Sequence, residues 1–176
     1  TQGFEFARDR KFPVHIHPQI MNPIGFERVN DPLLSPVLEY VFDVSMCIGK
    51  MMMSGVFLQF PDVDFIFAHY GGVLPILKER FDTTYVMLRR RNIVKDISKV
   101  PSDFFKNLYF DMSGSKSPAS LQGVLEITNC AHLCWGSDFP ANKNFSASLG
   151  VISQTISSSE NRDLICGGNI LGILKK

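Results

Sequence analysis

Four short segments of the chain share one pattern: a run of apolar or β-branched residues stops at a polar residue that is followed by Gly or Pro. These segments are 12–18, 64–72, 108–114 and 131–140. Runs of this kind, bounded by turn residues, are typical of buried strands. The stretches between them are long enough for helices and loops, so the pattern predicts four strand-then-helix units of an α/β fold. Such units form a parallel sheet or barrel whose functional site lies at the carboxyl ends of the strands.

Helix signals occupy the stretches between the strands. Ser35 and Pro36 are an N-cap and an N1 proline for a helix that should run to Leu58, where Gly49 and Gly55 should either bend it or divide it into two helices. Further helices are expected from about residues 74, 101, 118, 146 and 159. The loop 19–36 is longer than usual and either shapes a substrate pocket or is a plain insertion. Residues 1–11 are expected to be a polar lead-in cut from something longer.

Composition excludes several classes of protein. The length of 176 residues suits a single domain. Apolar residues make up 45% of the chain, but they form no uncharged run of about 18 residues, which argues against a membrane span. A net charge of +1 offers no electrostatic case for nucleic acid. The four cysteines form no C-x-x-C pair, and residues 130–134 have the wrong spacing for a zinc ribbon or finger. We therefore expect reduced, mostly buried thiols in a cytoplasmic protein.

Candidate chemistry stands at the ends of the predicted strands. His17, His69 and Asp138 follow three different strands, and a parallel barrel would bring them together over one opening. Imidazole nitrogens and a carboxylate oxygen are a suitable ligand set for a divalent cation. Each residue alone is more typical of a hydrogen-bonded structural role, but their recurrence at equivalent positions favours a metal site.

Other polar residues near these ends have two interpretations each. His15 and His17 form an H-x-H pair whose side chains share one face of a strand, so both could bind one metal. We expect instead that His15 packs in the barrel interior below the site. For Asp111 and Ser113 we expect a hydrogen-bonded turn, with support of a site residue as the alternative. The pair Gly71–Gly72 either lets the backbone approach a ligand or opens the turn before the next helix.

Taken in order, these motifs resemble those of the amidohydrolase-related family. They are His17-Pro18, then F-P-x-V-x-F-I-x-A-H-x-G-G-x-L-P at 60–75, Y-x-D-x-S-G at 109–114, W-G-S-D-F-P at 135–140 and G-N-I-L-G at 168–172. The likeness covers residues 11–174. It is strongest for the branch of metal-dependent decarboxylases that includes aminocarboxymuconate-semialdehyde decarboxylase and 6-methylsalicylate decarboxylase.

The resemblance implies a role for each of four residues. His17 matches a metal ligand, and Asp138 matches an aspartate that binds or borders the metal and handles protons. His69 matches a catalytic histidine beside the metal that either orients and activates a metal-bound water or polarises the substrate. Arg80 matches an arginine that in some members crosses a dimer interface to the neighbour's substrate carboxylate. The resemblance thus implies a TIM-barrel-like metal-dependent hydrolase fold, one Zn²⁺ or Mn²⁺ per subunit, and a homodimer.

One departure from the family pattern affects every expectation. Family members begin with a strand whose H-x-H pair supplies two metal ligands, and nothing before His15 provides such a pair. The spacing of His17, His69 and Asp138 fits the second half of the family pattern. We therefore expect residues 1–176 to be one amidohydrolase-related domain truncated on its N-terminal side, with about four of the eight strands of a (β/α)₈ barrel.

The expected function is metal-dependent, non-oxidative decarboxylation of an aromatic or unsaturated carboxylic acid, a carbon-carbon lyase reaction. One alternative is a hydrolase in which a metal-activated water attacks an ester or lactone. The other is a half-barrel without activity that serves as an interaction module. For both the decarboxylase and the hydrolase, the expected substrate is a small molecule. Neither a nucleic acid nor a membrane is expected as a partner.

Overall fold

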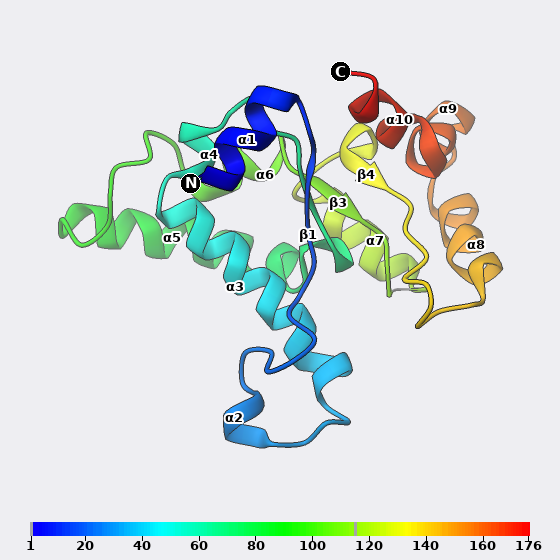
Figure 1. Cartoon of the computed structure of the whole chain (residues 1–176), viewed down its shortest axis with the longest axis horizontal. Coiled ribbons are helices and arrows are strands. Elements are labelled where there is room, and N and C mark those ends of the chain that lie inside the picture. Colours follow the sequence, from blue (N-terminus) through cyan, green and yellow to red (C-terminus); the bar gives the residue numbers. More distant parts are fainter. Residues whose placement is uncertain (1, 115) are drawn as a thin grey trace.

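The computed structural model describes residues 2–114 and 116–176. In this part of the chain a four-stranded parallel sheet lies at the centre, with its strands in the order β1, β2, β3 and β4 (Figure 1). The strands are β1 (Val14–Ile16), β2 (Phe65–Phe67), β3 (Tyr109–Asp111) and β4 (Leu133–Cys134). Each strand falls inside one of the four segments that the hydrophobic pattern predicted, so the predicted α/β fold is confirmed.

The register of the sheet brings the carboxyl ends of its strands to one edge. Ile16 pairs with Phe67, which in turn pairs with Phe110, and Asp111 pairs with Cys134. Because the strands are parallel and their ends are aligned in register, the residues that follow them leave the sheet at the same edge. The candidate site residues lie there.

Helices connect the strands and enclose the core on one face of the sheet (Figure 1). In chain order they are α1 (Gln2–Arg10), α2 (Phe26–Val29), α3 (Tyr40–Met53), α4 (Val56–Gln59), α5 (Leu74–Arg90), α6 (Pro101–Phe105), α7 (Pro118–Leu125), α8 (Phe145–Thr155), α9 (Ser159–Asp163) and α10 (Asn169–Leu174). The π-helical turn Ser35–Glu39 leads into α3, and the π-helical turn Leu164–Gly168 leads into α10. The 3₁₀ turn His69–Gly71 precedes α5, and the 3₁₀ turn Cys130–His132 precedes β4.

The long helix predicted from Ser35 bends at one of its two glycines. Helix α3 ends at Met53, and α4 begins after Gly55, whose φ of 78° lies in the left-handed region. Gly49 instead continues inside α3, where an added Cβ atom would lie 3.1 Å from the ring of Phe81 on α5. Gly49 therefore lets α3 and α5 approach closely, whereas Gly55 separates α3 from α4.

The start of the chain contains a helix that the sequence analysis did not predict. Residue 1 lies outside the described residues, and residues 2–10 form helix α1. Phe4 packs edge-to-face on Phe60 at 5.6 Å and on Phe65 at 5.4 Å between ring centroids, and Ala7 is buried one turn later. Two apolar residues on one helix face are a weak signal among so many charged residues, so the helix was missed.

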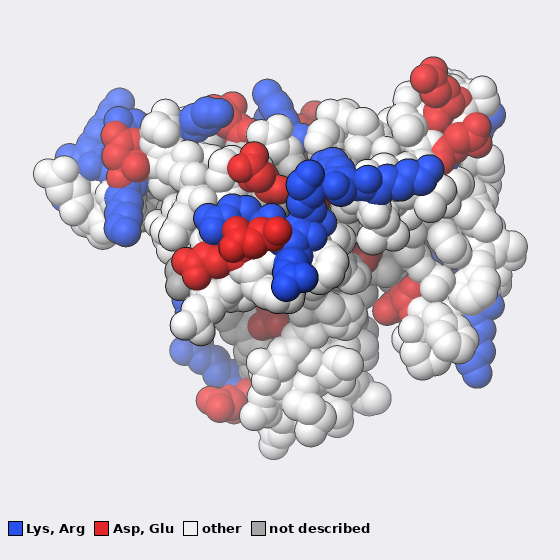
Figure 2. Space-filling model, turned by 45° about the horizontal axis from the view of Figure 1, so that its top comes forward, with Lys and Arg blue, Asp and Glu red and all other residues white. Residues whose placement is uncertain are grey.

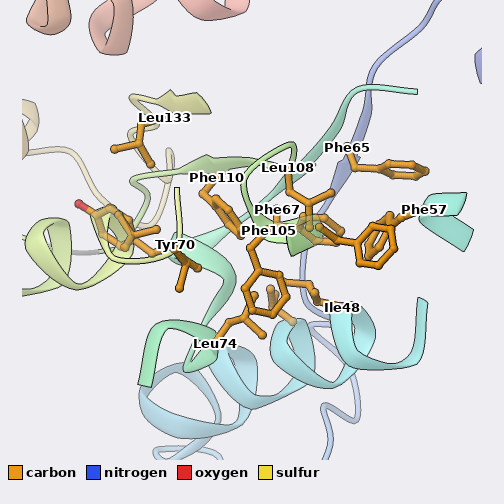
Figure 3. Close-up of a cluster of buried hydrophobic side chains, with 14 of the residues drawn as sticks. Ile48, Phe57, Phe65, Phe67, Tyr70, Leu74, Phe105, Leu108, Phe110 and Leu133 are labelled. Carbon is orange, nitrogen blue, oxygen red and sulfur yellow. The ribbon is translucent and has the colours of Figure 1, made fainter. Parts of the chain in front are cut away.

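The core lies on one face of the sheet because strand side chains alternate between faces. Phe65, Phe67 and Phe110 point to this face, where they meet Ile48 of α3 and Leu74 of α5 (Figure 3). Phe67, Phe110 and Leu74 are fully buried. Burial of each such side chain stabilises the fold by about 1.5–3 kcal/mol relative to its exposure to water, so the strands are anchored mainly by their aromatic residues.

The opposite face of the sheet carries a more polar row. His15 is aligned with Ile66, and Ile66 is aligned with Tyr109 on the next strand. The His15 side chain is 52% exposed, and burial raises the pKa of the Tyr109 phenol. In a closed barrel this face would line the interior, which is where we expected His15.

The surface agrees with the composition. On the face seen in Figure 2, Lys and Arg are interspersed with Asp and Glu, and the lower part is largely uncharged. Within the two described ranges, no helix combines the length and apolar character needed to cross a membrane.

Candidate active site

His17, His69 and Asp138 lie together at the carboxyl edge of the sheet. They follow β1, β2 and β4 respectively, and one potential ligand atom from each lies within 4.8 Å of the other two. The ring centroids of His17 and His69 are 5.3 Å apart. His17 is exposed, whereas the other two are half-buried. The structure therefore brings into one cluster the three residues that the sequence placed at strand ends.

Hydrogen bonds determine the tautomers of the two histidines. Nδ1 of His17 lies 3.0 Å from the carbonyl oxygen of Pro18, and Nδ1 of His69 lies 3.2 Å from that of Ser113. A carbonyl oxygen can only accept, so each Nδ1 carries the hydrogen and donates it. In the neutral rings the lone pair is therefore on Nε2, where it is free to bind a metal or accept a proton.

His69 begins a turn in which four successive residues have positive φ. The values are 54° at His69, 57° at Tyr70, 73° at Gly71 and 70° at Gly72. For the two residues with a Cβ atom, this conformation costs about 1–2 kcal/mol each. Such a turn persists only where its surroundings hold it firmly. Two sets of contacts do so here.

The first set joins the turn to α3. An added Cβ atom at Gly72 would lie 2.0 Å from the carbonyl oxygen of Val41, and one at Gly71 would lie 3.2 Å from Ile48 Cδ1. Ser45 Oγ lies 3.1 Å from the Gly71 carbonyl oxygen and accepts a hydrogen bond from the backbone of residue 73 at 2.8 Å. The glycine pair thus allows the turn to touch α3, and in these contacts it serves packing within the chain.

The second set joins the turn to β3. The buried carboxylate of Asp111 accepts hydrogen bonds from the backbone N–H groups of His69 at 3.0 Å and Ser113 at 2.9 Å. Its other oxygen lies 2.9 Å from His15 Nε2. Burial alone would raise the pKa of Asp111, but hydrogen bonds from His15 and Ser113 hold it below its ordinary value. The hydrogen bond to Asp111 also raises the pKa of His15 against the opposing effect of burial.

A cavity of about 1000 Å³ opens over the cluster. Its floor is formed by the two histidines and Asp138. Small residues of the β3–α7 region line it on the one hand, and apolar residues of α5, of α3 and of the π-helical turn before α3 on the other; these are Gly114, Ala119, Ser120 and Gly123, and Pro75, Ile76, Val41 and Val37. Ile20 and Pro36 also line it, so the long loop 19–36 does shape the pocket. Its volume is at the upper end for small-molecule sites.

Two residues considered in the sequence analysis lie outside this cluster, and two residues of the cavity were missed. Arg80 is exposed on α5 and is not among the described residues that line the cavity. His15 points to Asp111 rather than to the cluster. Tyr70 and Tyr40 both line the cavity but were not predicted, because an aromatic residue in a helix or turn carries no signal that separates a cavity wall from the core.

Comparisons with known proteins agree on one family. The sequence profile of the amidohydrolase family matches residues 1–175. The chain is 28% identical over 127 residues to 6-methylsalicylic acid decarboxylase of Penicillium expansum, which covers 72% of this chain. It is similar in structure to 5-carboxyvanillate decarboxylase of Sphingomonas paucimobilis, with a TM-score of 0.87, 22% identity and 98% of this chain covered.

A further solved structure is dihydroxybenzoic acid decarboxylase of Polaromonas sp. JS666, described with bound manganese and the inhibitor 2-nitroresorcinol. Its TM-score is 0.80 at 22% identity, again over 98% of this chain. The chain spans 52% of each of these two structures and 38% of the Penicillium enzyme. The neighbours are TIM-barrel proteins, so the four-stranded parallel sheet is part of a barrel of this kind.

Proposed function

This chain belongs to the amidohydrolase family, and we propose that it carries part of the active site of a non-oxidative decarboxylase acting on an aromatic or unsaturated carboxylic acid. The observation that carries the proposal is the convergence of His17, His69 and Asp138 on the floor of one cavity. Relatives and structural neighbours named as decarboxylases support the reaction class.

The three side chains fit a divalent metal ion. Two imidazole nitrogens and a carboxylate oxygen suit Zn²⁺ or Mn²⁺, and manganese is described in the Polaromonas structure. Two donors on one such ion lie at most about 4.2 Å apart, so a cluster within 4.8 Å needs only a small closing movement. We propose that His17 and Asp138 hold the ion and that His69 lies beside it. When bound, the ion would offset negative charge that develops on the substrate.

Asp138 is the proposed proton donor. When the bond between the substrate carbon and its carboxylate breaks, the electron pair stays on that carbon, CO₂ leaves, and the carbon takes a proton. A carboxyl group on the cavity floor can deliver this proton. His69, whose Nδ1–H is held by the Ser113 carbonyl oxygen, presents the lone pair of Nε2, which would accept a hydrogen bond from a substrate hydroxyl or a water and keep it in place.

A homodimer is proposed, in which Arg80 reaches the substrate carboxylate of the neighbouring subunit. The described residues that line the cavity of one copy include no Lys or Arg, so a substrate carboxylate would lack a cationic side chain there. Arg80 lies one helical turn beyond Ile76, which lines the cavity and is 85% exposed. An apolar groove of about 420 Å³, lined in part by Phe42, Met46 and Phe81, offers a surface for the second copy.

We further propose that residues 1–176 form a domain that lacks the N-terminal strands of the barrel. Within the described residues no strand pairs with the free edge of β1, and additional strands there would supply further metal ligands. Catalytic zinc sites use about three protein ligands plus an open position. The proposed location is the cytoplasm, where the four free thiols would stay reduced.

The test is the variant D138N in the full-length protein, assayed for CO₂ release from a panel of aromatic carboxylic acids. Loss of the proton donor should lower the rate by about 10²–10⁴-fold, since general acid catalysis contributes that much. Release of CO₂ without consumption of water would also distinguish this reaction from hydrolysis.

His132→Ala is the matched control. This histidine packs against Tyr109, with ring centroids 4.8 Å apart, at the opposite end of the strands, and its loss should leave the rate unchanged. A D138N protein as fast as the parent would show that Asp138 is not the proton donor.

A further inference from the structure

Asp111 ends β3 and lies beneath the cluster rather than in it. Asp111 is 7% exposed and is not among the described residues that line the cavity. One carboxylate oxygen accepts hydrogen bonds from the backbone N–H groups of His69 and Ser113 and from the Ser113 hydroxyl. The other accepts from His15 Nε2 at 2.9 Å. Both oxygens are thus in use, and the backbone of His69 is one of the groups they hold.

Ser113 relays the effect of Asp111 to the His69 ring. Because the Ser113 hydroxyl donates its hydrogen to Asp111, its oxygen presents only lone pairs to His69 Nδ1, which is 3.2 Å away. The Ser113 carbonyl oxygen lies at the same distance from Nδ1. Both neighbours of Nδ1 are therefore acceptors, and the ring satisfies them only with its hydrogen on Nδ1.

We propose that Asp111 is a positioning residue for His69, an inference that rests on the role of His69 in the proposed function. Asp111 holds the His69 backbone in the left-handed turn and, through Ser113, selects the tautomer that leaves the Nε2 lone pair free. It acts through His69 and touches no substrate itself. Hydrogen-bond partners of this kind fix the tautomer and the ring orientation of a histidine.

A carboxylate suits this place because it offers acceptors on both sides. An amide at residue 111 has one acceptor oxygen. If that oxygen serves His69 and Ser113, the NH₂ group faces His15 Nε2, which must then lose its hydrogen and accept. The isosteric variant D111N should therefore change the tautomer of His15 while it preserves that of His69, whereas D111A should release His69.

The experiment is two-bond ¹H–¹⁵N correlation NMR on the metal-free full chain with ¹⁵N-labelled histidine, at a mildly alkaline pH where the rings are neutral. In the parent chain His69 should carry its hydrogen on Nδ1 and His15 on Nε2. D111N should move the His15 hydrogen to Nδ1. D111A should populate the Nε2–H form of His69, because both acceptors that hold its Nδ1–H lose their support.

Asp64→Asn is the matched control, because its carboxylate pairs with Lys176 at 2.8 Å beside the other end of β2. It should leave the His69 spectrum unchanged. A folded D111A chain with the parent's His69 tautomer would overturn the proposal. If D111A does not fold, D111N decides: a His15 hydrogen that stays on Nε2 contradicts the network. Absence of CO₂ release with the expected tautomers would instead refute the proposed function alone.

Discussion

The substitution Gly72→Ala tests the close packing of the left-handed turn on α3. Gly72 has φ 70° and ψ −121°, a combination that residues with a Cβ atom rarely adopt. An added methyl carbon would lie 2.0 Å from the Val41 carbonyl oxygen and 2.3 Å from Ser45 Oγ. The first of these atoms belongs to the backbone of a helix, so it cannot rotate away.

Two costs add in this variant. The backbone conformation costs about 1–3 kcal/mol for a residue other than glycine, and overpacking at a rigid contact costs about 1–3 kcal/mol. A loss of about 2–6 kcal/mol is expected, against a total stability of about 5–15 kcal/mol for an ordinary domain. With a urea dependence of about 2 kcal/mol per molar, the unfolding midpoint should fall by about 1–3 M.

Urea unfolding can be followed by the fluorescence of Trp135, the single tryptophan of the chain, which packs against Phe145 at 6.1 Å between centroids. Gly150→Ala is the control, because Gly150 lies inside α8 with no atom within 4 Å of an added Cβ. That variant should gain about 0.5–1 kcal/mol. A G72A protein within about 1 kcal/mol of the parent would refute the packing argument.

Two further substitutions test the hydrogen bonds around the sheet. Because the pKa of His15 is raised, the contribution of His15 to folding stability is complete below the ordinary pKa of 6.5 and is lost as pH rises through the raised pKa. The pKa of Asp111 is lowered, so the contribution of Asp111 to stability is lost only in acid. His15→Ala should therefore cost more stability at pH 5.5 than at pH 8.5, by less than about 1 kcal/mol since the side chain is half-exposed; equal losses in urea unfolding at the two pH values would contradict this. Asn169→Ala removes the Nδ2 donor to the carbonyl oxygens of Cys130 at 2.8 Å and Leu133 at 2.7 Å. Thermal unfolding of this variant should show that the free energy of unfolding falls by about 2–4 kcal/mol. A decrease below about 0.5 kcal/mol would show that water replaces these hydrogen bonds.

The strands were predictable because their signal is local. Short apolar runs that end at turn residues mark 14–16, 65–67, 109–111 and 133–134 without reference to the rest of the chain. The helices with a proline at their start were predictable for the same reason. Helix α1 was missed, because its stability depends on the contact of Phe4 with two phenylalanines about sixty residues away in sequence.

The candidate site was predictable as a set of residue types but not as a geometry. His17, His69 and Asp138 stand out because they end predicted strands, and a parallel sheet must bring such ends together. Arg80 carries no comparable signal, and one copy of the chain leaves it exposed on α5. The link from Asp111 to His15 was unpredictable, because it requires the register of three strands to be known.

The sequence by itself determined where the strands end and which polar side chains stand at those ends, because both follow from patterns within a few residues. Only the tertiary structure decided how His69 is held. Its positive φ is unfavourable locally and is maintained by Asp111 of β3 and by the contact of Gly72 with α3. Elements distant in sequence supply these contacts, so no local pattern around His69 can encode the conformation that brings it beside His17 and Asp138.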